Sequence, residues 1–242
     1  MTLSKTRGYL VHLYTMSTLA FVVLGIQWTL EGRYAAALIA MAVTLVIDAT
    51  DGALARKYHI AHTAPGIDGP LLDNVVDFTS YVFLPLLFMM HAGMLAQPMT
   101  LFAAVVAFSS AFGFSRTSAK QVDEGFFVGF PSYWNVVALY AFLLDLPAGA
   151  TTALVLVLSL LVFADVRFLY VSRLRRHRLL HLVLGGAWGV ACLLALLLEP
   201  GLLRTALIYG SLGYVAFYTA HSLVADLGTR RRAADPGHPR GA

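Results

Sequence analysis

Long apolar segments recur along the chain, each close to the roughly 20 residues that an α-helix needs to cross a bilayer. Within each segment the apolar residues are continuous rather than alternating with polar ones, which argues against a β-barrel. Charged residues make up 12% of the 242-residue chain, about half of the roughly 25% that is usual for a soluble domain. The sequence therefore predicts an all-α, polytopic membrane protein.

About eight transmembrane helices are expected. The predicted spans are Gly8–Leu30, Tyr34–Arg56, Pro70–Leu95, Pro98–Lys120, Pro131–Leu146, Gly149–Arg167, Leu179–Leu198 and Leu202–Leu227. We expect residues 1–227 to form one integral membrane domain. Residues 228–242, which carry several arginines and then mostly small and polar residues, are expected to be a basic, disordered tail.

The basic residues predict the orientation in the membrane. With the N-terminus in the cytoplasm, only Arg33 and Arg204 of the 17 lysines and arginines fall on the outer side. Because cytoplasmic loops are enriched in basic residues, both termini are predicted to be cytoplasmic. This arrangement also accounts for the net charge of +4 without a nucleic-acid partner. The single cysteine, Cys192, excludes an internal disulfide.

Four aspartates lie at the inner ends of the second and third predicted spans. Asp48 and Asp51 occur in DATDGALAR, and Asp73 and Asp77 occur in GPLLDNVVD. Their separations of three and four residues place each pair on one face of a helix. Carboxylates beside hydrocarbon are costly unless a positive partner compensates them, and Mg²⁺ or Mn²⁺ prefers oxygen ligands. The pattern predicts a site for one or two divalent ions at the membrane surface.

Small and basic residues accompany the aspartates. Gly52 and Ala55 leave the helix surface open, Arg56 supplies a cation suited to phosphate, and Gly69 begins the third span near amides that favour anions. These features predict a site for a nucleotide diphosphate beside the metal. Asp68, directly before Gly69, is expected instead to cap the helix.

The combined pattern, D-x-x-D-G-x-x-A-R followed by G-x-x-x-D-x-x-x-D, resembles the signature of the CDP-alcohol phosphotransferases. These are integral membrane enzymes that transfer a phosphoryl-linked group from a CDP-activated donor to an alcohol. The connection between Arg56 and Gly69 is longer than is usual in the family, and it resembles that of the bacterial phosphatidylcholine synthases. The segments Gly69–Pro85 and Phe126–Tyr140 also resemble that subfamily.

This resemblance implies a reaction and roles for the motif residues. It implies that Asp48, Asp51, Asp73 and Asp77 hold the metals, that Gly52, Ala55, Arg56 and Gly69 line the CDP site, and that Asp77 is also the general base. The implied reaction joins CDP-diacylglycerol and choline into phosphatidylcholine and CMP in a bacterial inner membrane, with two Mn²⁺ or Mg²⁺ ions.

Two alternatives stay open at this point. The same chemistry could use serine, glycerol phosphate or inositol phosphate as the acceptor. A divalent-cation transporter is an alternative of another class. A transporter should place its acidic residues near the middle of the membrane, whereas these aspartates lie at the inner ends of the predicted spans beside Gly52 and Arg56.

Aromatic and basic residues near the motif are candidates for substrate contacts. Choline has no N–H to donate and is recognised by aromatic faces; the candidates are Phe78, Tyr81, Phe130, Tyr133 and Trp134, which could instead form an interfacial aromatic belt. Arg116 and Lys120 could bind a lipid phosphate, or could only reflect the distribution of basic residues across the membrane.

The seventh predicted span carries small residues that bear on assembly. Gly185, Gly186, Gly189 and Ala191 form a small-residue face. Such a face allows close helix packing, either between two copies in a homodimer or within one chain.

Overall fold

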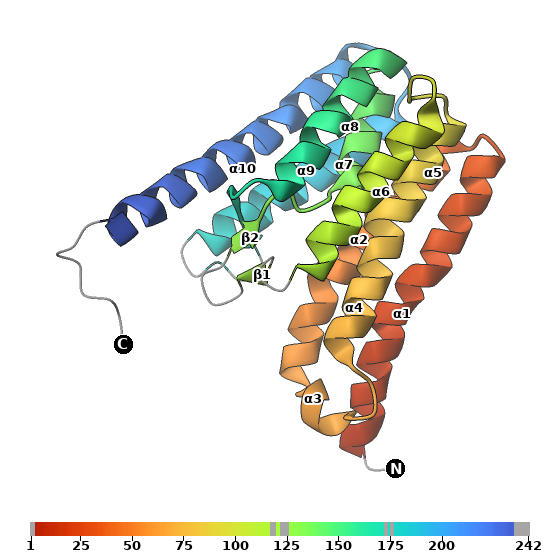
Figure 1. Cartoon of the computed structure of the whole chain (residues 1–242). Helices are drawn as coiled ribbons and strands as arrows, with labels where there is room; N and C mark the ends of the chain where they lie inside the picture. The colour runs from red at the N-terminus through yellow and green to blue at the C-terminus, as the bar shows by residue number, and fades with distance from the viewer. Residues whose placement is uncertain (1–2, 117–119, 122–125, 172–173, 175–176, 235–242) are drawn as a thin grey trace. The chain divides into compact units, whose positions relative to one another are not determined.

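The computed structural model describes residues 3–116, 120–121, 126–171, 174 and 177–234, which are mainly helical (Figure 1). The chain divides into two compact units. The first contains Met1–Phe114 and Ser132–Ser159, and the second contains Ser115–Pro131 and Leu160–Ala242. The prediction of an all-α membrane protein is confirmed, because each of the eight predicted spans coincides with a helix or a continuous helical segment.

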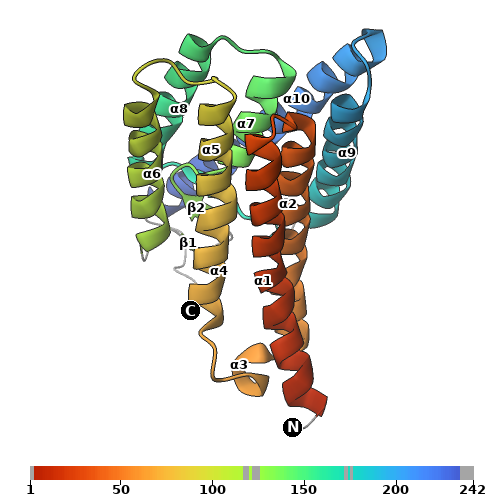
Figure 2. The same ribbon diagram turned by 90° about the vertical axis from the view of Figure 1, so that its right-hand side faces the viewer.

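The first unit contains the helices from α1 to α7 and most of α8. These are α1 (Leu3–Leu30), α2 (Tyr34–Lys57), α3 (Ile60–Thr63), α4 (Gly69–Phe78), the π-helical turn η1 (Thr79–Phe83), α5 (Leu84–His91), α6 (Met99–Ser115), α7 (Trp134–Leu143) and α8 (Ala148–Phe163). The short helix α3 lies within the predicted connection after α2, at the end of the unit where the chain begins (Figures 1 and 2).

Four helical segments among the described residues are long and apolar enough to cross a membrane. They are α1, α2, the continuous segment Gly69–His91, and Arg178–Leu197. The helices α6, α7 and α8 are apolar but shorter than a typical span. The structure therefore places helices at the predicted positions, and several of these helices are shorter than the predicted spans.

Helix α1 is the element against which the other helices of the site pack, since it contacts α2, α3, α4 and α5. Its buried residues recur every three or four positions and are mainly small or polar. Small residues let helix backbones approach closely where lipid removes the hydrophobic drive for association. At Gly25, an added Cβ would lie 2.9 Å from the Leu84 Cδ2 atom, so a glycine lets α1 meet the start of α5.

The segment from α4 to α5 is one helix with a capped start and a widened middle. The Asp68 carboxylate accepts a hydrogen bond from the Leu71 N–H at 3.0 Å, which confirms the predicted cap. Pro70 occupies the first turn, where no hydrogen bond is lost. Pro85 cannot donate to a carbonyl in the preceding turn, and the π-helical turn η1 lies directly before it.

The second unit combines a small sheet with two long helices, α9 (Arg178–Leu197) and α10 (Leu202–Ala234). The antiparallel sheet has the order β1–β2–β3, with β1 at Lys120–Gln121, β2 at Phe126–Val128 and β3 at Arg167–Leu169. Two predicted spans were expected to continue as helix through Lys120 and Arg167. They end earlier because the backbone at these positions pairs with β2 instead.

Helix α10 is fastened to β3 and extends further than expected. The Ser222 hydroxyl accepts a hydrogen bond from the Leu169 N–H, and the Tyr218 hydroxyl donates one to the Leu169 carbonyl. The predicted tail begins at residue 228, but α10 continues to Ala234. An ion pair one turn apart on α10, between Arg230 and Asp226, supports this extension. Residues 235–242 lie outside the described part of the chain.

The small residues of α9 have different surroundings. A Cβ added at Gly185 would lie 3.2 Å from the Tyr214 hydroxyl of α10, so this glycine serves packing within the unit. Apart from the adjacent residues and backbone of α9 itself, no described heavy atom lies within 4 Å of a Cβ added at Gly186 or Gly189. The homodimer therefore stays a prediction.

The cap at Asp68 provides a test of how α4 is stabilised. Replacing Asp68 with alanine should lower the free energy of unfolding by about 1 kcal/mol, because the Leu71 N–H loses its acceptor. The measurement is thermal unfolding of the purified protein in detergent. Asp68→Asn is the control, since asparagine caps equally well without charge. Equal destabilisation by both substitutions would contradict a capping role.

Candidate metal centre

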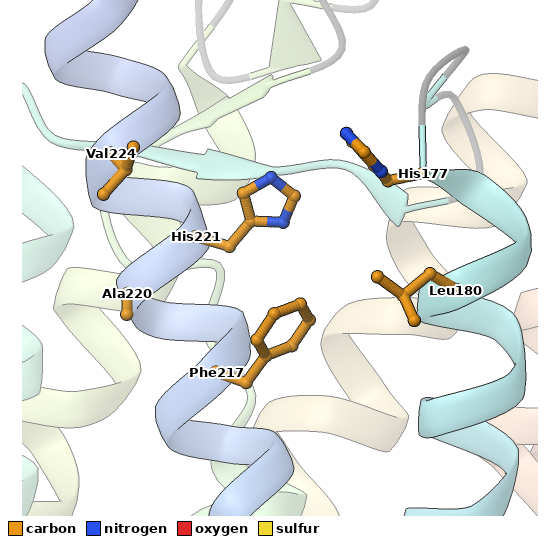
Figure 3. Close-up of a pocket in the computed structure, with 6 residues that line it drawn as sticks. All are labelled: His177, Leu180, Phe217, Ala220, His221 and Val224. Atoms are coloured by element: carbon orange, nitrogen blue, oxygen red, sulfur yellow. The ribbon is translucent and has the colours of Figure 1, made fainter.

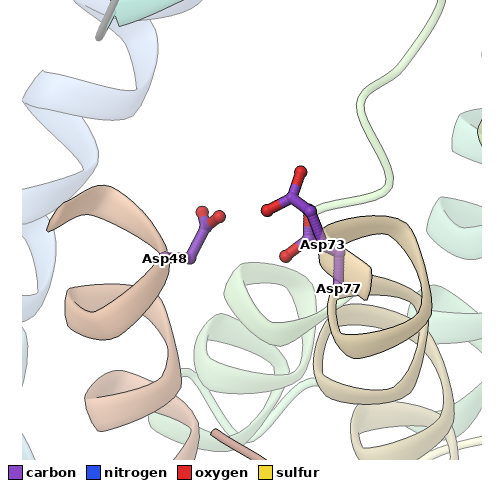
Figure 4. Close-up of side chains that lie close together, drawn as sticks. All are labelled: Asp48, Asp73 and Asp77. Carbon is purple, nitrogen blue, oxygen red and sulfur yellow. The ribbon is translucent and has the colours of Figure 1, made fainter. Parts of the chain in front are cut away.

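Three carboxylates from two helices meet in the first unit. Asp48 lies on α2, and Asp73 and Asp77 lie one turn apart on α4. One oxygen from each carboxylate lies within 4.8 Å of the other two. Figure 4 shows the Asp48 side chain extending from its helix toward the pair on α4. All three side chains are half-buried, so the cluster is neither deep in the unit nor fully solvated.

The donor set of this cluster fits a hard divalent cation. It consists of carboxylate oxygens, the ligands that Mg²⁺ and Mn²⁺ prefer. Carboxylates held this close repel one another strongly in a half-buried position, and a cation removes that cost. The structure thus brings together three of the four aspartates predicted as metal ligands. Their role as ligands stays a prediction.

The fourth aspartate has a different setting. Asp51 is 6% exposed, and its Oδ2 atom accepts a hydrogen bond from the Thr15 hydroxyl of α1 at 2.8 Å. It lies on α2 close to one turn beyond Asp48, outside the group of carboxylates that lie within 4.8 Å of one another. In this arrangement α1 fixes the orientation of Asp51, a contact that the sequence pattern alone did not predict.

Tyr81 joins the turn η1 to the carboxylate cluster. Its hydroxyl donates a hydrogen bond of 2.7 Å to the Asp48 Oδ2 atom. This bond crosses from η1 to α2 and holds the Asp48 side chain against the helix that carries Asp73 and Asp77. π-Helical turns frequently occur at functional sites, and this one places a tyrosine hydroxyl on a candidate ligand. The sequence indicates Tyr81 only as a candidate choline contact, so this bond to Asp48 is a finding of the structure.

The residues predicted to line the nucleotide site surround the same helix ends. A Cβ added at Gly52 would lie 3.3 Å from an Arg56 guanidinium nitrogen, so the glycine leaves room for Arg56 to lie along α2. Ala55 is half-buried and Arg56 is exposed. Gly69 begins α4 one turn before Asp73. These positions are compatible with a phosphate group approaching the end of α2.

The aromatic candidates separate into core and site residues. Trp134 is fully buried, and its indole N–H donates to the Ser110 hydroxyl at 2.7 Å. It packs in the core, and we do not include it among the choline contacts. Tyr133 is half-buried, with its ring centroid 6.2 Å from that of Tyr81. Phe78 packs edge-on against Phe114, with ring centroids 5.4 Å apart.

The remaining predicted contacts belong to the second unit. Phe130 is half-buried, and its backbone N–H donates to the Leu161 carbonyl at 3.1 Å. Arg116 is half-buried directly after α6. The backbone of Lys120 pairs with Phe127, and its side chain lies outside the described part of the structure. The proposed roles of these three residues stay predictions.

The second unit has a pocket of a different chemical kind. The pocket is about 340 Å³ in volume and is lined by His177, Leu180, Phe217, Ala220, His221 and Val224 (Figure 3). These lining residues include two imidazoles and no carboxylate. His221 is also 2.9 Å from His181, measured between the Nδ1 and Nε2 atoms. Hard-cation chemistry is therefore assigned to the aspartates of the first unit.

Comparisons with known proteins agree with the motif. A family model described as CDP-alcohol phosphatidyltransferase matches residues 9–172. A Legionella pneumophila protein named phosphatidylcholine synthase is 36% identical over 221 residues, covering 87% of this chain and 85% of the relative. A Pseudomonas aeruginosa protein of the same name is 34% identical over 199 residues, covering 82% and 83%. A Legionella bozemanae protein, also so named, is 42% identical over 146 residues, covering 60% and 67%.

The carboxylate cluster should lose metal affinity when one member is neutralised. Asp73→Asn should weaken Mn²⁺ binding at least tenfold, because an amide oxygen carries no negative charge. The measurement is the free Mn²⁺ signal in electron paramagnetic resonance during titration of the purified protein. Asp145→Asn, at an exposed position beyond α7, is the matched control. Unchanged affinity in the Asp73 variant would argue against the assigned site.

The Tyr81 hydroxyl should contribute to the same binding. Tyr81→Phe removes only the oxygen that bonds to Asp48, so the Asp48 carboxylate loses one restraint. A lost hydrogen bond to a charged group costs about 1.5–3 kcal/mol, and we expect Mn²⁺ affinity to fall while the fold is retained. The same titration, together with a thermal unfolding curve, measures both. If the variant unfolds at a lower temperature but binds Mn²⁺ with unchanged affinity, Tyr81 contributes to packing alone.

Proposed function

This chain belongs to the CDP-alcohol phosphatidyltransferase family, and we propose that it transfers the phosphatidyl group of CDP-diacylglycerol to choline. The products are phosphatidylcholine and CMP. The observation that carries this proposal is the convergence of Asp48, Asp73 and Asp77. It occurs in a chain that matches proteins named phosphatidylcholine synthase over most of their length. The proposed enzyme is an integral membrane protein.

The motif aspartates are assigned to binding and proton transfer. Asp48, Asp73 and Asp77 would hold divalent ions, two Mn²⁺ or Mg²⁺, with Asp51 beside them as a further ligand. Such ions, when bound, neutralise charge on a diphosphate and on its leaving oxygen. The Arg56 guanidinium lies along α2 beside Gly52, the residue after Asp51. From there it would supply a further positive charge to the phosphates.

Proton transfer is assigned to Asp77. Its carboxylate accepts the proton of the choline hydroxyl as the choline oxygen attacks the phosphorus that carries the diacylglycerol. The new bond joins the choline oxygen to this phosphorus, and the bond from the phosphorus to the bridging oxygen of the diphosphate breaks. CMP leaves with the bonding electrons. Asp77 suits this role because it is half-buried and lies beside the other two carboxylates.

The quaternary ammonium of choline is assigned to the aromatic side of the cluster. Tyr133 presents a half-buried ring, its centroid 6.2 Å from that of Tyr81, whose hydroxyl donates to Asp48. A cation is attracted to the face of such a ring, and the acidic cluster adds a favourable negative charge. Phe78, the residue directly after Asp77 at the end of α4, is a further candidate for this surface.

The arrangement in the membrane is also part of the proposal. We place both termini and the aspartate cluster on the cytoplasmic side of a bacterial inner membrane. This orientation is supported by the distribution of lysine and arginine along the sequence. Assembly as a homodimer is supported only by the small residues of α9 that no described neighbour covers.

The reaction is tested by an acceptor assay. The purified protein receives labelled CDP-diacylglycerol with choline, serine, glycerol phosphate or inositol phosphate, and CMP and lipid products are measured. We expect product with choline and Mn²⁺ or Mg²⁺, and loss of product with EDTA. We expect Asp77→Asn to lower kcat at least a hundredfold, as removal of a general base does.

Each other result has a defined meaning. Product with a different acceptor would correct the substrate. Metal uptake by proteoliposomes without any release of CMP would favour the transporter alternative. Full turnover by the Asp77→Asn variant would remove the proposed base from the mechanism.

If Tyr133 contacts choline, replacing its ring should change the KM for choline and not the KM for CDP-diacylglycerol. Tyr133→Ala should raise the choline KM about tenfold, since a desolvated cation–π contact is worth roughly 1–2 kcal/mol. The KM for CDP-diacylglycerol should change little. Tyr133→Phe is the matched control, because it keeps the ring and should retain most of the choline affinity. Steady-state kinetics with each substrate varied in turn measures both constants; equal changes in the two would count against the contact.

A further inference from the structure

The buried face of α1 carries a histidine that the mechanism above does not use. His12 is 2% exposed, and its Nε2 atom has no hydrogen-bond partner among the described residues. A buried polar atom without a partner costs about 1–3 kcal/mol. Buried polar groups in folded proteins are therefore nearly always paired, and an exception calls for a functional or structural reason.

The surroundings of His12 place it at the start of α4. A Cβ added at Gly69 would lie 3.4 Å from the His12 Cε1 atom. Because Cε1 is bonded to both ring nitrogens, Nε2 also lies close to this helix end. Gly69 is one of the residues assigned to the nucleotide site, so the imidazole borders that site from α1.

The register of α1 against α2 gives the same placement. The Thr15 hydroxyl donates to Asp51, and the neighbouring Tyr14 and Thr50 hydroxyls lie 2.8 Å apart. The two helices run in opposite directions, and each residue advances about 1.5 Å along its helix. His12 lies three residues back from Thr15 and two back from Tyr14, so it is level with the stretch of α2 from Gly52 to Leu54.

His12, Gly69 and the stretch Gly52–Leu54 thus lie at about one level on three helices. The three clustered carboxylates lie further along, because Asp73 is one turn beyond Gly69 on α4 and Asp48 precedes Asp51 on α2. This separation places His12 with the residues assigned to the nucleotide rather than with the candidate metal ligands.

We infer that His12 is a binding residue for the nucleotide part of the donor, through a hydrogen bond from its imidazole to the nucleoside diphosphate. This inference rests on the proposed function, because it needs a nucleotide bound between the ends of α2 and α4. An imidazole nitrogen can donate to a phosphate oxygen or exchange a hydrogen bond with the edge of a pyrimidine base. His12 takes no part in the proton transfer.

The test uses the full-length protein purified in detergent, with CDP as the probe. CDP affinity is measured by isothermal titration calorimetry in the presence of Mg²⁺, and Mn²⁺ affinity is measured separately without nucleotide. The variants are His12→Ala, His12→Asn, which keeps a donor and an acceptor, and Thr18→Val. Thr18 is the control because it is a polar residue of the same buried face of α1 and is also 2% exposed.

We expect His12→Ala to weaken CDP binding about three- to tenfold, the effect of losing one hydrogen bond. The KM for CDP-diacylglycerol should rise by a similar factor, while Mn²⁺ affinity and the choline KM stay within twofold of the wild type. His12→Asn should recover part of the CDP affinity. Thr18→Val should bind CDP as the wild type does.

Two results would overturn the assignment of His12. One is wild-type CDP affinity in both His12 variants, and the other is an equal loss in the Thr18→Val control. If His12→Ala does not fold, His12→Asn and His12→Gln carry the same comparison. A wild-type protein that binds no CDP and releases no CMP would instead remove the proposed function itself, whatever the variants do.

Discussion

Electrostatic repulsion among Asp48, Asp73 and Asp77 is the constraint on which the rest of the first unit depends. Three carboxylates with oxygens within 4.8 Å of one another oppose the approach of α2 and α4. The fold holds these helices together through packing on α1 and through the Tyr81–Asp48 hydrogen bond. Such an arrangement is costly in isolation and favourable around a divalent cation. The same property makes it suited to a diphosphate substrate.

Helix α1 performs two tasks with one face. Its glycines allow close approach, as at Gly25 against Leu84, and its polar residues reach the site, as Thr15 does with Asp51. In a membrane, apolar side chains gain little from leaving lipid for another helix, so close backbone approach and hydrogen bonds carry more of the association. A buried face of glycine, threonine and histidine is therefore compatible with both stability and substrate binding.

The aromatic residues show how burial divides similar side chains between structure and function. Trp134 and Tyr133 are neighbours in sequence, and both were reasonable choline contacts. The start of α7 turns the indole into the core, where Ser110 accepts its N–H, and leaves Tyr133 half-buried near Tyr81. The sequence does not show which of the two is buried, because that depends on which side of the start of α7 faces α6.

The sequence by itself determined the helical membrane fold, the family, the positions of the helices and the cap at Asp68. These follow from local properties: the length of apolar segments, the spacing of aspartates along a helix, and a side chain that bonds to its own turn. Only the tertiary structure decided that Asp51 bonds to Thr15, that Tyr81 reaches Asp48, that Trp134 is buried, and that His12 lies beside Gly69. Each of these contacts joins different helices, so it depends on how the helices pack. Local sequence patterns do not determine that packing.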